Sequence, residues 1–431
     1  MISFKILEEK FLAYLVCSVV PFLAFSIFFA DLICSILSIF FIIYLIKHNS
    51  IFFYKNIIFI AALFFYFLCL FSSFLSEEIL FSLKSSLPLI RIIIFIFLVS
   101  FLIENNKFFL DVFYNFLKYT FLTLVIYGLV LYFYEYYISL SNNTIAYVRL
   151  KLPFSDEEKL GSLLVRLYGL LIAIYFLKKN YKKFENFLLF FLTLFTSIVI
   201  LLSGERSSFF FLMLLTSIFF ISLNIGFKIK ISSFFILFTS FAVILNQNLN
   251  LSERMILDKN NDLKFSSNQK ELIIFTSAHT AHYLSGFKMF KDKPFTGQGP
   301  RMFRLLCDKE GYKIIINDKK SCSSHPHNTY IQLLAEIGVF GTLLFSLIFF
   351  HIIFILAKHV VSKIFFKKNT LSNYQIIIST SALIVVWPFS PNGNFFNNWM
   401  LIICAFPLSF YFNEFFRYNF YNKNKHHRFI K

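Results

Sequence analysis

Long runs of apolar residues, separated by short polar segments, make up most of the chain. Twelve runs approach or exceed the roughly 18 residues that a helix needs to cross the hydrocarbon core of a membrane. They cover residues 11–29, 31–47, 56–76, 86–104, 117–138, 163–178, 184–202, 207–223, 229–246, 328–357, 375–390 and 397–412. Because the runs do not alternate in polarity, they favour helices over the strands of a membrane β-barrel. The pattern predicts an all-α polytopic membrane protein with about 12 transmembrane helices.

Only one segment between the runs is long, and it covers residues 247–327. We therefore expect transmembrane helices 1–9 in residues 1–246, a loop with short helices in 247–327, helices 10–12 in 328–412, and a basic tail in 413–431. A connection of this length is usually functional. Its stretch "SNQKELIIFTSAHTAHYLSGFKMF" predicts an amphipathic helix, and "KPFTGQGP" predicts a turn. No small-residue cleavage site follows the first apolar run, so we expect a retained helix there.

The composition agrees with a membrane protein and explains the charge. Hydrophobic residues make up 58% of the chain and aromatic residues 21%, which excludes an ordinary soluble domain. The formal net charge is +18. Outside the long loop, most Lys and Arg residues fall in every second short loop and in the tail, which by the positive-inside rule places both termini inside and the long loop outside. The charge therefore implies membrane lipids, and not nucleic acid, as partners.

Two of the six cysteines stand apart from the others. Cys307 and Cys322 both fall in the long loop, whereas the other four lie in apolar runs, where we expect them to pack. An oxidising exterior would allow the two loop cysteines to pair. We expect a disulfide that ties the loop down just before two histidines.

The stretch "LLSGERSSFFFLMLL" places Arg206 where one apolar run ends and the next begins. If Ser203 caps the following helix, Arg206 lies in its first turn, where unbonded N–H groups and the helix dipole favour anions. A guanidinium there would complete a site for a phosphate or diphosphate. The alternative is an interfacial arginine whose charged end reaches the lipid headgroups.

Other charged residues are candidates for binding or chemistry. In "SDEEKLGSLLVRLYG", Asp156 and Glu157 are candidate sugar-binding or acid/base carboxylates, or they are a solvated helix start. Arg166 lies inside an apolar run, as does Arg91, and a charge in that position is costly and usually functional.

The segment "KPFTGQGPRMFRLLC" in the long loop supplies two more arginines, Arg301 and Arg304. They are further candidate phosphate ligands, or they are solvated. The two close glycines of the segment are weak evidence alone, because most such pairs are turns.

The stretch "SSHPHNTYIQLLAEIGVFGTLLF" brings a histidine to the start of the tenth run. If a regular helix begins at His327, about 100° per residue places Gly338 and Gly341 on the same stripe as His327. Glycines there would let a neighbouring helix approach closely. Glu336 points the opposite way on this helix, so we expect it to face another helix or a cavity. Asn328 is expected to cap the helix or to hydrogen-bond a sugar hydroxyl.

These blocks resemble the O-antigen ligase and O-antigen (Wzy-type) polymerase family of bacterial inner-membrane glycosyltransferases. The family signature is His, then Asn, Ser or Gln, nine residues, Gly, two residues and Gly, matched here by His327, Asn328, Gly338 and Gly341. The stretches "SGERSS", "DEEKLGS", "GQGPRMFRLLC" and "WPFSPNGNFFNNW" are also similar, in the same order. The resemblance covers most of the chain from residue 150 onward.

The resemblance implies metal-independent glycosyl transfer at the periplasmic face of the inner membrane, with no cofactor. The donor is a glycan on undecaprenyl diphosphate, His327 is the general base for the acceptor hydroxyl, and Arg206 holds the diphosphate. The partners implied are a lipid-linked oligosaccharide and, for a polymerase, a chain-length regulator.

One family feature is missing from the long loop. Many relatives carry a second arginine shortly before the segment Pro-x-x-Gly-x-Gly, where this chain has His279 and His282. Either a histidine substitutes for it, or Arg301 or Arg304 supplies the charge, or the donor contacts differ.

Three classes of function remain to be compared. A polymerase-like enzyme is the leading hypothesis, and a ligase that transfers the glycan to lipid A–core or to a protein is the alternative. A transporter or flippase for a lipid-linked sugar would predict charges in mid-membrane and repeat symmetry. Here the charges gather near the outer face and no internal repeat is found, and a structural or receptor protein would leave the histidine and glycine pattern unexplained.

Overall fold

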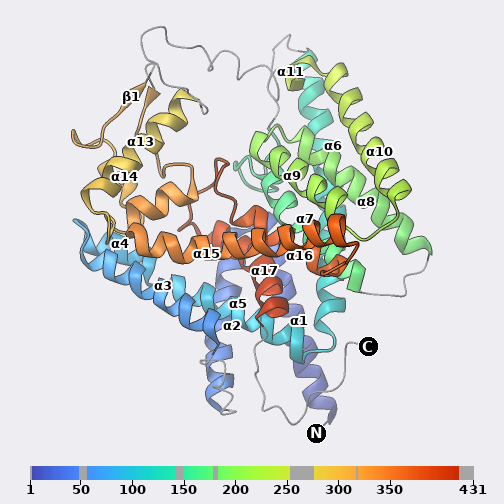
Figure 1. Ribbon diagram of the computed structural model, residues 1–431, viewed down its shortest axis with the longest axis horizontal. Helices are drawn as coiled ribbons and strands as arrows, with labels where there is room; N and C mark the ends of the chain where they lie inside the picture. The colour runs from blue at the N-terminus through green and yellow to red at the C-terminus, as the bar shows by residue number, and fades with distance from the viewer. Residues whose placement is uncertain are drawn as a thin grey trace.

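A computed structural model describes residues 2–47, 56–141, 149–177, 183–252, 276–316 and 319–416. The chain is a bundle of helices (Figure 1), and each predicted apolar run overlaps at least one of them. The first part contains α1 (Ile2–Phe25), α2 (Ile27–Lys47), α3 (Ile57–Phe74), α4 (Ile79–Ser86), α5 (Leu89–Asn105), α6 (Phe109–Ser141), α7 (Leu160–Leu177), α8 (Lys183–Leu202), α9 (Arg206–Ser222), α10 (Phe227–Gln247) and α11 (Leu249–Ser252). The second part contains α13 (Ser277–Asp292), α14 (Phe303–Leu306), β1 (Ile315–Ile316), β2 (Lys319–Lys320), α15 (Thr329–Phe366), α16 (Asn373–Val385) and α17 (Asn398–Phe415).

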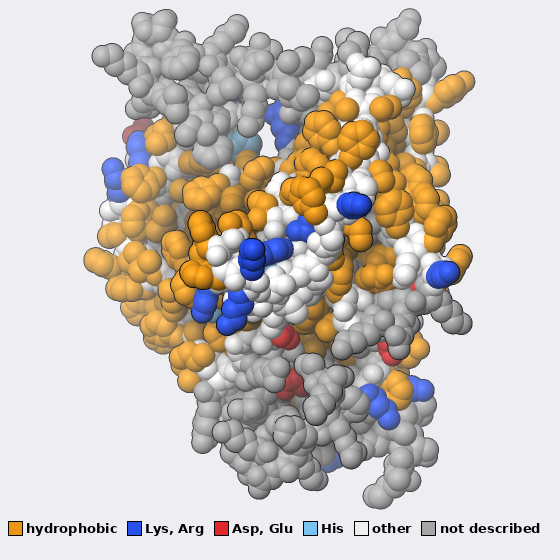
Figure 2. Space-filling view, turned by 45° about the vertical axis from the view of Figure 1, so that its right-hand side comes forward, with side chains coloured by type: hydrophobic (Ala, Val, Ile, Leu, Met, Phe, Trp, Pro, Cys, Tyr) orange, Lys and Arg blue, Asp and Glu red, His pale blue; other side chains and the backbone are white. Residues whose placement is uncertain are grey.

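Among the described residues, eight helical segments are long and apolar enough to cross a membrane, and three shorter apolar helices accompany them. Hydrophobic side chains cover much of the face of the bundle seen in Figure 2. Large side chains such as those of Phe235 and Phe354 are mostly exposed. Helices whose outward faces are this apolar are stable when those faces meet lipid. The protein is an all-α, multi-pass membrane protein.

Helix α7 forms the centre of the bundle. Nearly all of its residues from Leu160 to Ile174 are buried, and it packs against α16, α17, α6, α8 and α9. Gly169 allows the closest of these contacts, because a side chain at that position would overlap the hydroxyl of Ser381 on α16. A central helix buried on all sides can carry a charged residue only where polar groups surround that residue.

The residues 276–316 and 319–328, here called the loop subdomain, pack against the first part of α15 (Figure 1, upper left). α13 begins at Ser277, with Thr276 as its N-cap, and matches the second half of the predicted amphipathic helix. The first half of that prediction lies outside the described residues. A turn follows α13 as expected, and β1 and β2 pair antiparallel. Met289, Met302 and Phe303 form part of a small hydrophobic core of their own.

Helix α15 is not the regular helix that the tenth apolar run predicted. Gly338 has φ 74° and ψ −172°, so the helix is broken there by a residue in the left-handed half of conformational space. The loop subdomain causes this break: the N–H of Val339 donates to the carbonyl of Pro294 at 2.9 Å. A side chain on Gly338 would overlap the backbone of Phe295. Only glycine fits this position without strain.

Candidate functional site

Four histidines come together at the start of α15. His279 and His282 lie one turn apart on α13, whereas His325 and His327 lie in the segment before α15. The ring centre of His327 is 5.6 Å from that of His279 and 5.3 Å from that of His282. It is 4.1 Å from that of His325. In the described part of the chain, no three His, Cys, Asp or Glu side chains are arranged to hold a metal ion.

A turn, and not the helix, presents His327. Asn328 caps α15, because its Oδ1 accepts hydrogen bonds from the N–H groups of Tyr330 (2.9 Å) and Ile331 (3.1 Å). His327 precedes this cap with a φ of 58°. A non-glycine residue adopts this left-handed conformation only where its surroundings hold it there. The prediction that His327 opens the helix is therefore wrong.

The predicted stripe of His327, Gly338 and Gly341 is wrong for the same reason. A helical wheel assumes uniform backbone angles, and both His327 and Gly338 depart from them. Gly338 lies against a turn of the loop subdomain and not against a neighbouring helix. A side chain on Gly341 would first meet Ile337 of its own helix. Both glycines are buried, but neither provides the helix–helix contact that the sequence suggested.

Asn392, in the loop between α16 and α17, holds the turn that contains His325 and His327. Its N–H donates to the carbonyl of His327 at 2.7 Å, and its carbonyl accepts from Nε2 of His325 at 3.1 Å. The other ring nitrogen of His325 lies 2.9 Å from the hydroxyl of Ser324. Both nitrogens of His325 are therefore occupied. Sequence reasoning missed Asn392, although the block "WPFSPNGNFFNNW" that contains it was recognised as family-like.

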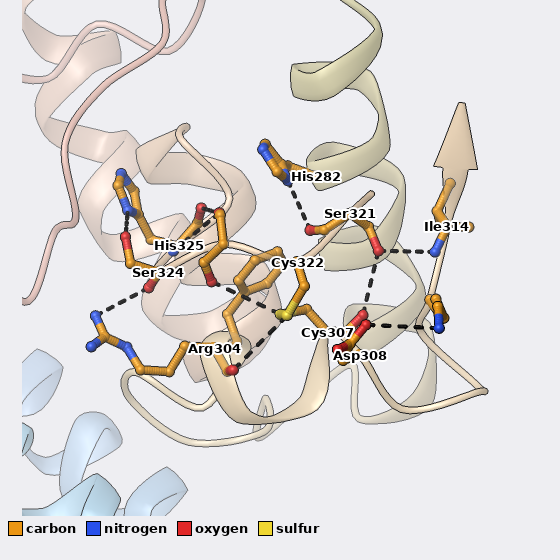
Figure 3. Close-up of a disulfide and its surroundings, with 12 residues drawn as sticks. His282, Arg304, Cys307, Asp308, Ile314, Ser321, Cys322, Ser324 and His325 are labelled. Carbon is orange, nitrogen blue, oxygen red and sulfur yellow. Dashed lines mark hydrogen bonds and ion pairs between the residues drawn. A yellow bond between two sulfur atoms is a disulfide. The ribbon is translucent and has the colours of Figure 1, made fainter. Parts of the chain in front are cut away.

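A disulfide supports His282 (Figure 3). Nδ1 of His282 donates to the carbonyl of Ser321 at 2.7 Å, so in the neutral ring the lone pair is on Nε2. Ser321 is held in turn by Ile314, whose carbonyl accepts from its N–H at 2.8 Å and whose N–H donates to its hydroxyl at 2.9 Å. The next residue, Cys322, forms a disulfide with Cys307. This covalent link fixes the segment against which His282 is oriented.

Burial makes the central imidazole neutral. Burial and, to a smaller extent, the other three imidazoles lower the pKa of His327 from 6.5 to about 3. The pKa of His325 falls to about 4, again chiefly through burial. Neither ring nitrogen of His327 takes part in a hydrogen bond within the described residues. At neutral pH this ring therefore keeps a lone pair that can accept a proton.

Arg304 brings positive charge to the histidines, and the charge of Arg301 interacts in turn with that of Arg304. Nη2 of Arg304 donates to the carbonyl of Ser324 at 3.2 Å (Figure 3), and its charge contributes to the low pKa of His325. Burial, followed by the charge of Arg304, lowers the pKa of Arg301. An anion bound here would relieve this repulsion and favour the protonated form of the imidazoles. Geometry and charge thus favour a negatively charged ligand.

Glu336 is completely buried beneath this arginine segment. Its carboxylate accepts hydrogen bonds from the N–H of Phe303 at 3.1 Å and from Nε2 of Gln332 at 2.9 Å. As expected, it does not contact His327. It holds the start of α14, which carries Arg304, against α15.

Arg206 is the first residue of α9, but the expected cap is wrong. Glu205, and not Ser203, occupies the N-cap position. The hydroxyl of Ser203 instead donates to the carbonyl of Ile200 at 2.7 Å. Oε1 of Glu205 accepts from the N–H groups of Gly161 (2.7 Å) and of the following serine (3.2 Å), at the start of α7. Burial raises the pKa of Glu205, and these hydrogen bonds oppose the rise.

The two predicted carboxylates before α7 take part in local ion pairs. Oδ1 of Asp156 lies 3.3 Å from Nζ of Lys151, with both side chains exposed. Oε2 of Glu157 lies 2.7 Å from Nζ of Lys159. Within the described residues neither carboxylate contacts a histidine of the cluster. Lys159 is the member of this segment whose charge reaches the cluster, where it contributes to lowering the pKa of His325.

Comparison with protein families gives one match, which covers residues 189–346 and is described as O-antigen ligase. The matched region begins in α8 and ends in α15, and it includes Arg206, the loop subdomain, His327 and both glycines of the signature. It does not include Asn392. No curated protein and no solved structure matches the chain.

Proposed function

We propose, from the match of residues 189–346 to the O-antigen ligase family, that this protein is a metal-independent glycosyltransferase of the bacterial inner membrane. Its donor is an oligosaccharide on undecaprenyl diphosphate, and its reaction is polymerase-like elongation of that glycan. The observation that supports the proposal most is the neutral imidazole of His327, set among three other imidazoles, one of which (His325) lies near Arg304.

His327 is the general base of the proposed reaction. An acceptor sugar hydroxyl gives its proton to a ring nitrogen of His327 while its oxygen forms a bond to the anomeric carbon of the donor sugar. The bond from that carbon to the diphosphate oxygen breaks, and its electron pair leaves with undecaprenyl diphosphate. The donor carries its own leaving group, so a base and cations are sufficient for the chemistry.

The arginines hold the diphosphate in this scheme. Arg304 lies beside His325, Arg301 interacts with Arg304, and Arg206 begins α9. His279 and His282 stand where many relatives have a second arginine, and we assign them to the donor as well. A bound diphosphate raises the pKa of the nearby imidazoles, so the donor itself makes His327 a stronger base.

We further propose that all twelve predicted spans cross the membrane, with both termini in the cytoplasm and residues 247–327 in the periplasm. The disulfide between Cys307 and Cys322 supports this orientation, because such bonds persist in oxidising compartments. The site then faces the compartment in which lipid-linked glycans are joined.

Deletion of the gene separates the two enzyme classes. If surface polysaccharide loses its long chains but keeps a single capped repeat, the protein is a polymerase. If all capped material disappears and lipid-linked polymer accumulates, it is a ligase that transfers to lipid A–core or to protein. A normal polysaccharide pattern would contradict both.

The His327→Ala variant should reproduce the deletion at normal protein abundance. His351→Ala is the matched control, because that histidine lies on α15, pairs with Tyr411 and has no part in the cluster. A fully active His327→Ala variant would refute the role of His327 as general base. Arg206→Ala should weaken binding of the lipid-linked donor, and an unchanged affinity would remove Arg206 from the diphosphate site.

A further inference from the structure

Arg166 is a buried charge that the proposed chemistry does not use. Its side chain lies within α7 and is 3% exposed. Nη1 donates to the carbonyl of Ser162 at 3.0 Å, and the guanidinium lies 5.6 Å from the ring centre of Phe211. Removing a guanidinium from water to this depth is costly. A residue retained at such a cost is expected to have a specific partner.

That partner is Asn392, 226 residues further along the chain. Nη2 of Arg166 donates to Oδ1 of Asn392 at 2.6 Å, whereas Nη1 donates to both the carbonyl and the hydroxyl of Ser162. The backbone of the same asparagine bonds to the turn of His325 and His327 on both sides. The side chain of Asn392 therefore faces the buried arginine, while its backbone faces the proposed base.

A second branch leads from Arg166 to the start of α9. Ser162, which accepts from Arg166, donates its own N–H to the carboxylate of Glu205. The hydroxyl of Ser208 donates to the other carboxylate oxygen of Glu205 at 2.9 Å. One continuous network thus connects the N-cap of α9 with the turn that presents His327.

We propose that Arg166 is a positioning residue, which through Asn392 holds the left-handed turn of His327 at a set position relative to the start of α9. This inference rests on the proposed function, in which His327 accepts the proton and Arg206 on α9 holds the diphosphate. Arg166 itself contacts neither substrate. It keeps the base, in the turn before α15, at a fixed position relative to the donor site at the start of α9.

The test uses the full-length protein purified in detergent and lipid-linked glycan extracted from a strain that lacks the gene. Arg166→Met and Asn392→Leu each remove the side-chain bond between the two residues. A base misplaced by about 1 Å lowers kcat on the order of a hundredfold, and the KM for the donor should change little because the cations are untouched. Asn392→Asp keeps an acceptor oxygen for Arg166 and should restore most of kcat.

Arg91→Lys is the control for a change of a partly buried arginine elsewhere in the bundle. Arg91 forms an ion pair of 2.7 Å with Asp31 between α2 and α5, away from the histidines, and the conservative change should leave kcat unaltered. If Arg166→Met does not fold, the inference is tested by comparing kcat of Asn392→Leu with kcat of Asn392→Asp.

The outcomes separate this inference from the proposed function. If Asn392→Leu retains full kcat while His327→Ala is inactive, the positioning role of Arg166 is refuted. The role of His327 as general base is then still supported. If Asn392→Leu lowers only the yield of folded protein, or if Asn392→Asp fails to restore kcat, the role of Arg166 is merely structural. If His327→Ala is active, the base itself is refuted.

Discussion

Asn392 and His327 are joined by a 2.7 Å hydrogen bond from the N–H of the asparagine to the carbonyl of the histidine. The bond connects the loop between α16 and α17 to the turn before α15. It explains how a non-glycine residue with a φ of 58° is kept in place. The position of the proposed base thus depends on a part of the chain that lies beyond the matched family region.

Replacing Gly338 with alanine should destabilise the protein. The new Cβ would overlap the backbone carbonyl of Phe295, and the residue would have to keep a φ of 74°. We expect a loss of about 1–3 kcal/mol from backbone strain, with the overlap adding to it. Thermal unfolding in detergent measures the loss. Gly311→Ala is the control, because nothing lies within 4 Å of its added Cβ, and equal stability of the two variants would contradict the prediction.

Acidification should destabilise the folded protein through the histidine cluster. The pKa of His327 is about 3 and that of His325 about 4 in the folded protein, both below the ordinary value of 6.5. Below pH 6.5 the unfolded chain therefore binds more protons than the folded protein, and stability falls as the pH falls. The unfolding temperature should decrease from pH 7.5 to pH 5. His325→Gln removes one of these groups, so its decrease should be smaller, and an equal decrease would count against the assignment.

Loss of the disulfide should loosen the loop subdomain. Cys307 and Cys322 are 15 residues apart, and closing a loop of that length contributes about 3 kcal/mol. In the double Cys→Ser variant, amide hydrogen exchange should become faster around Ser321 and His282. Reductant should have the same effect on the wild-type protein and none on the variant. Unchanged exchange after reduction would show that packing alone holds the segment.

Glu205→Gln should be more harmful than an ordinary change of a surface glutamate. The carboxylate of Glu205 accepts three hydrogen bonds in a buried position, and an amide presents a donor where an acceptor is needed. We expect a loss of about 1–3 kcal/mol in unfolding free energy. Glu158→Gln disrupts only an exposed pair with Arg149, for which less than about 1 kcal/mol is expected. Similar losses in denaturation experiments would argue against the network around Glu205.

The helices were predictable because their apolar runs are long and continuous, and such runs have few alternatives to a membrane helix. The pairing of Cys307 with Cys322 followed from their shared location in the loop. The kink at Gly338 was not predictable, because it depends on hydrogen bonds to residues 294–299 and not on the local sequence. A wheel built from the sequence alone assigns every residue a helical angle.

The site was predictable in part. His327 was identified from its spacing to the glycines, although that spacing reflects a kink and not a helical stripe. The role of Glu205 is not evident from the local sequence, because its carboxylate bonds to backbone groups 44 and 43 residues away at the start of α7. The importance of Asn392 comes from a contact with Arg166 across 226 residues, and nothing in the local sequence reports such a contact.

The attachment of the loop subdomain to α15 includes several hydrogen bonds between backbone groups. The N–H groups of Gln298 and Gly299 donate to carbonyls of α15 at 2.9 Å, next to Gly297, where a side chain would overlap Glu336. These groups carry no net charge, so dissolved salt has little influence on them, whereas the interactions of the charged arginines weaken as salt is added. A change in the ionic strength of the surroundings should therefore alter how tightly an anionic donor is held without moving the base that acts on its acceptor.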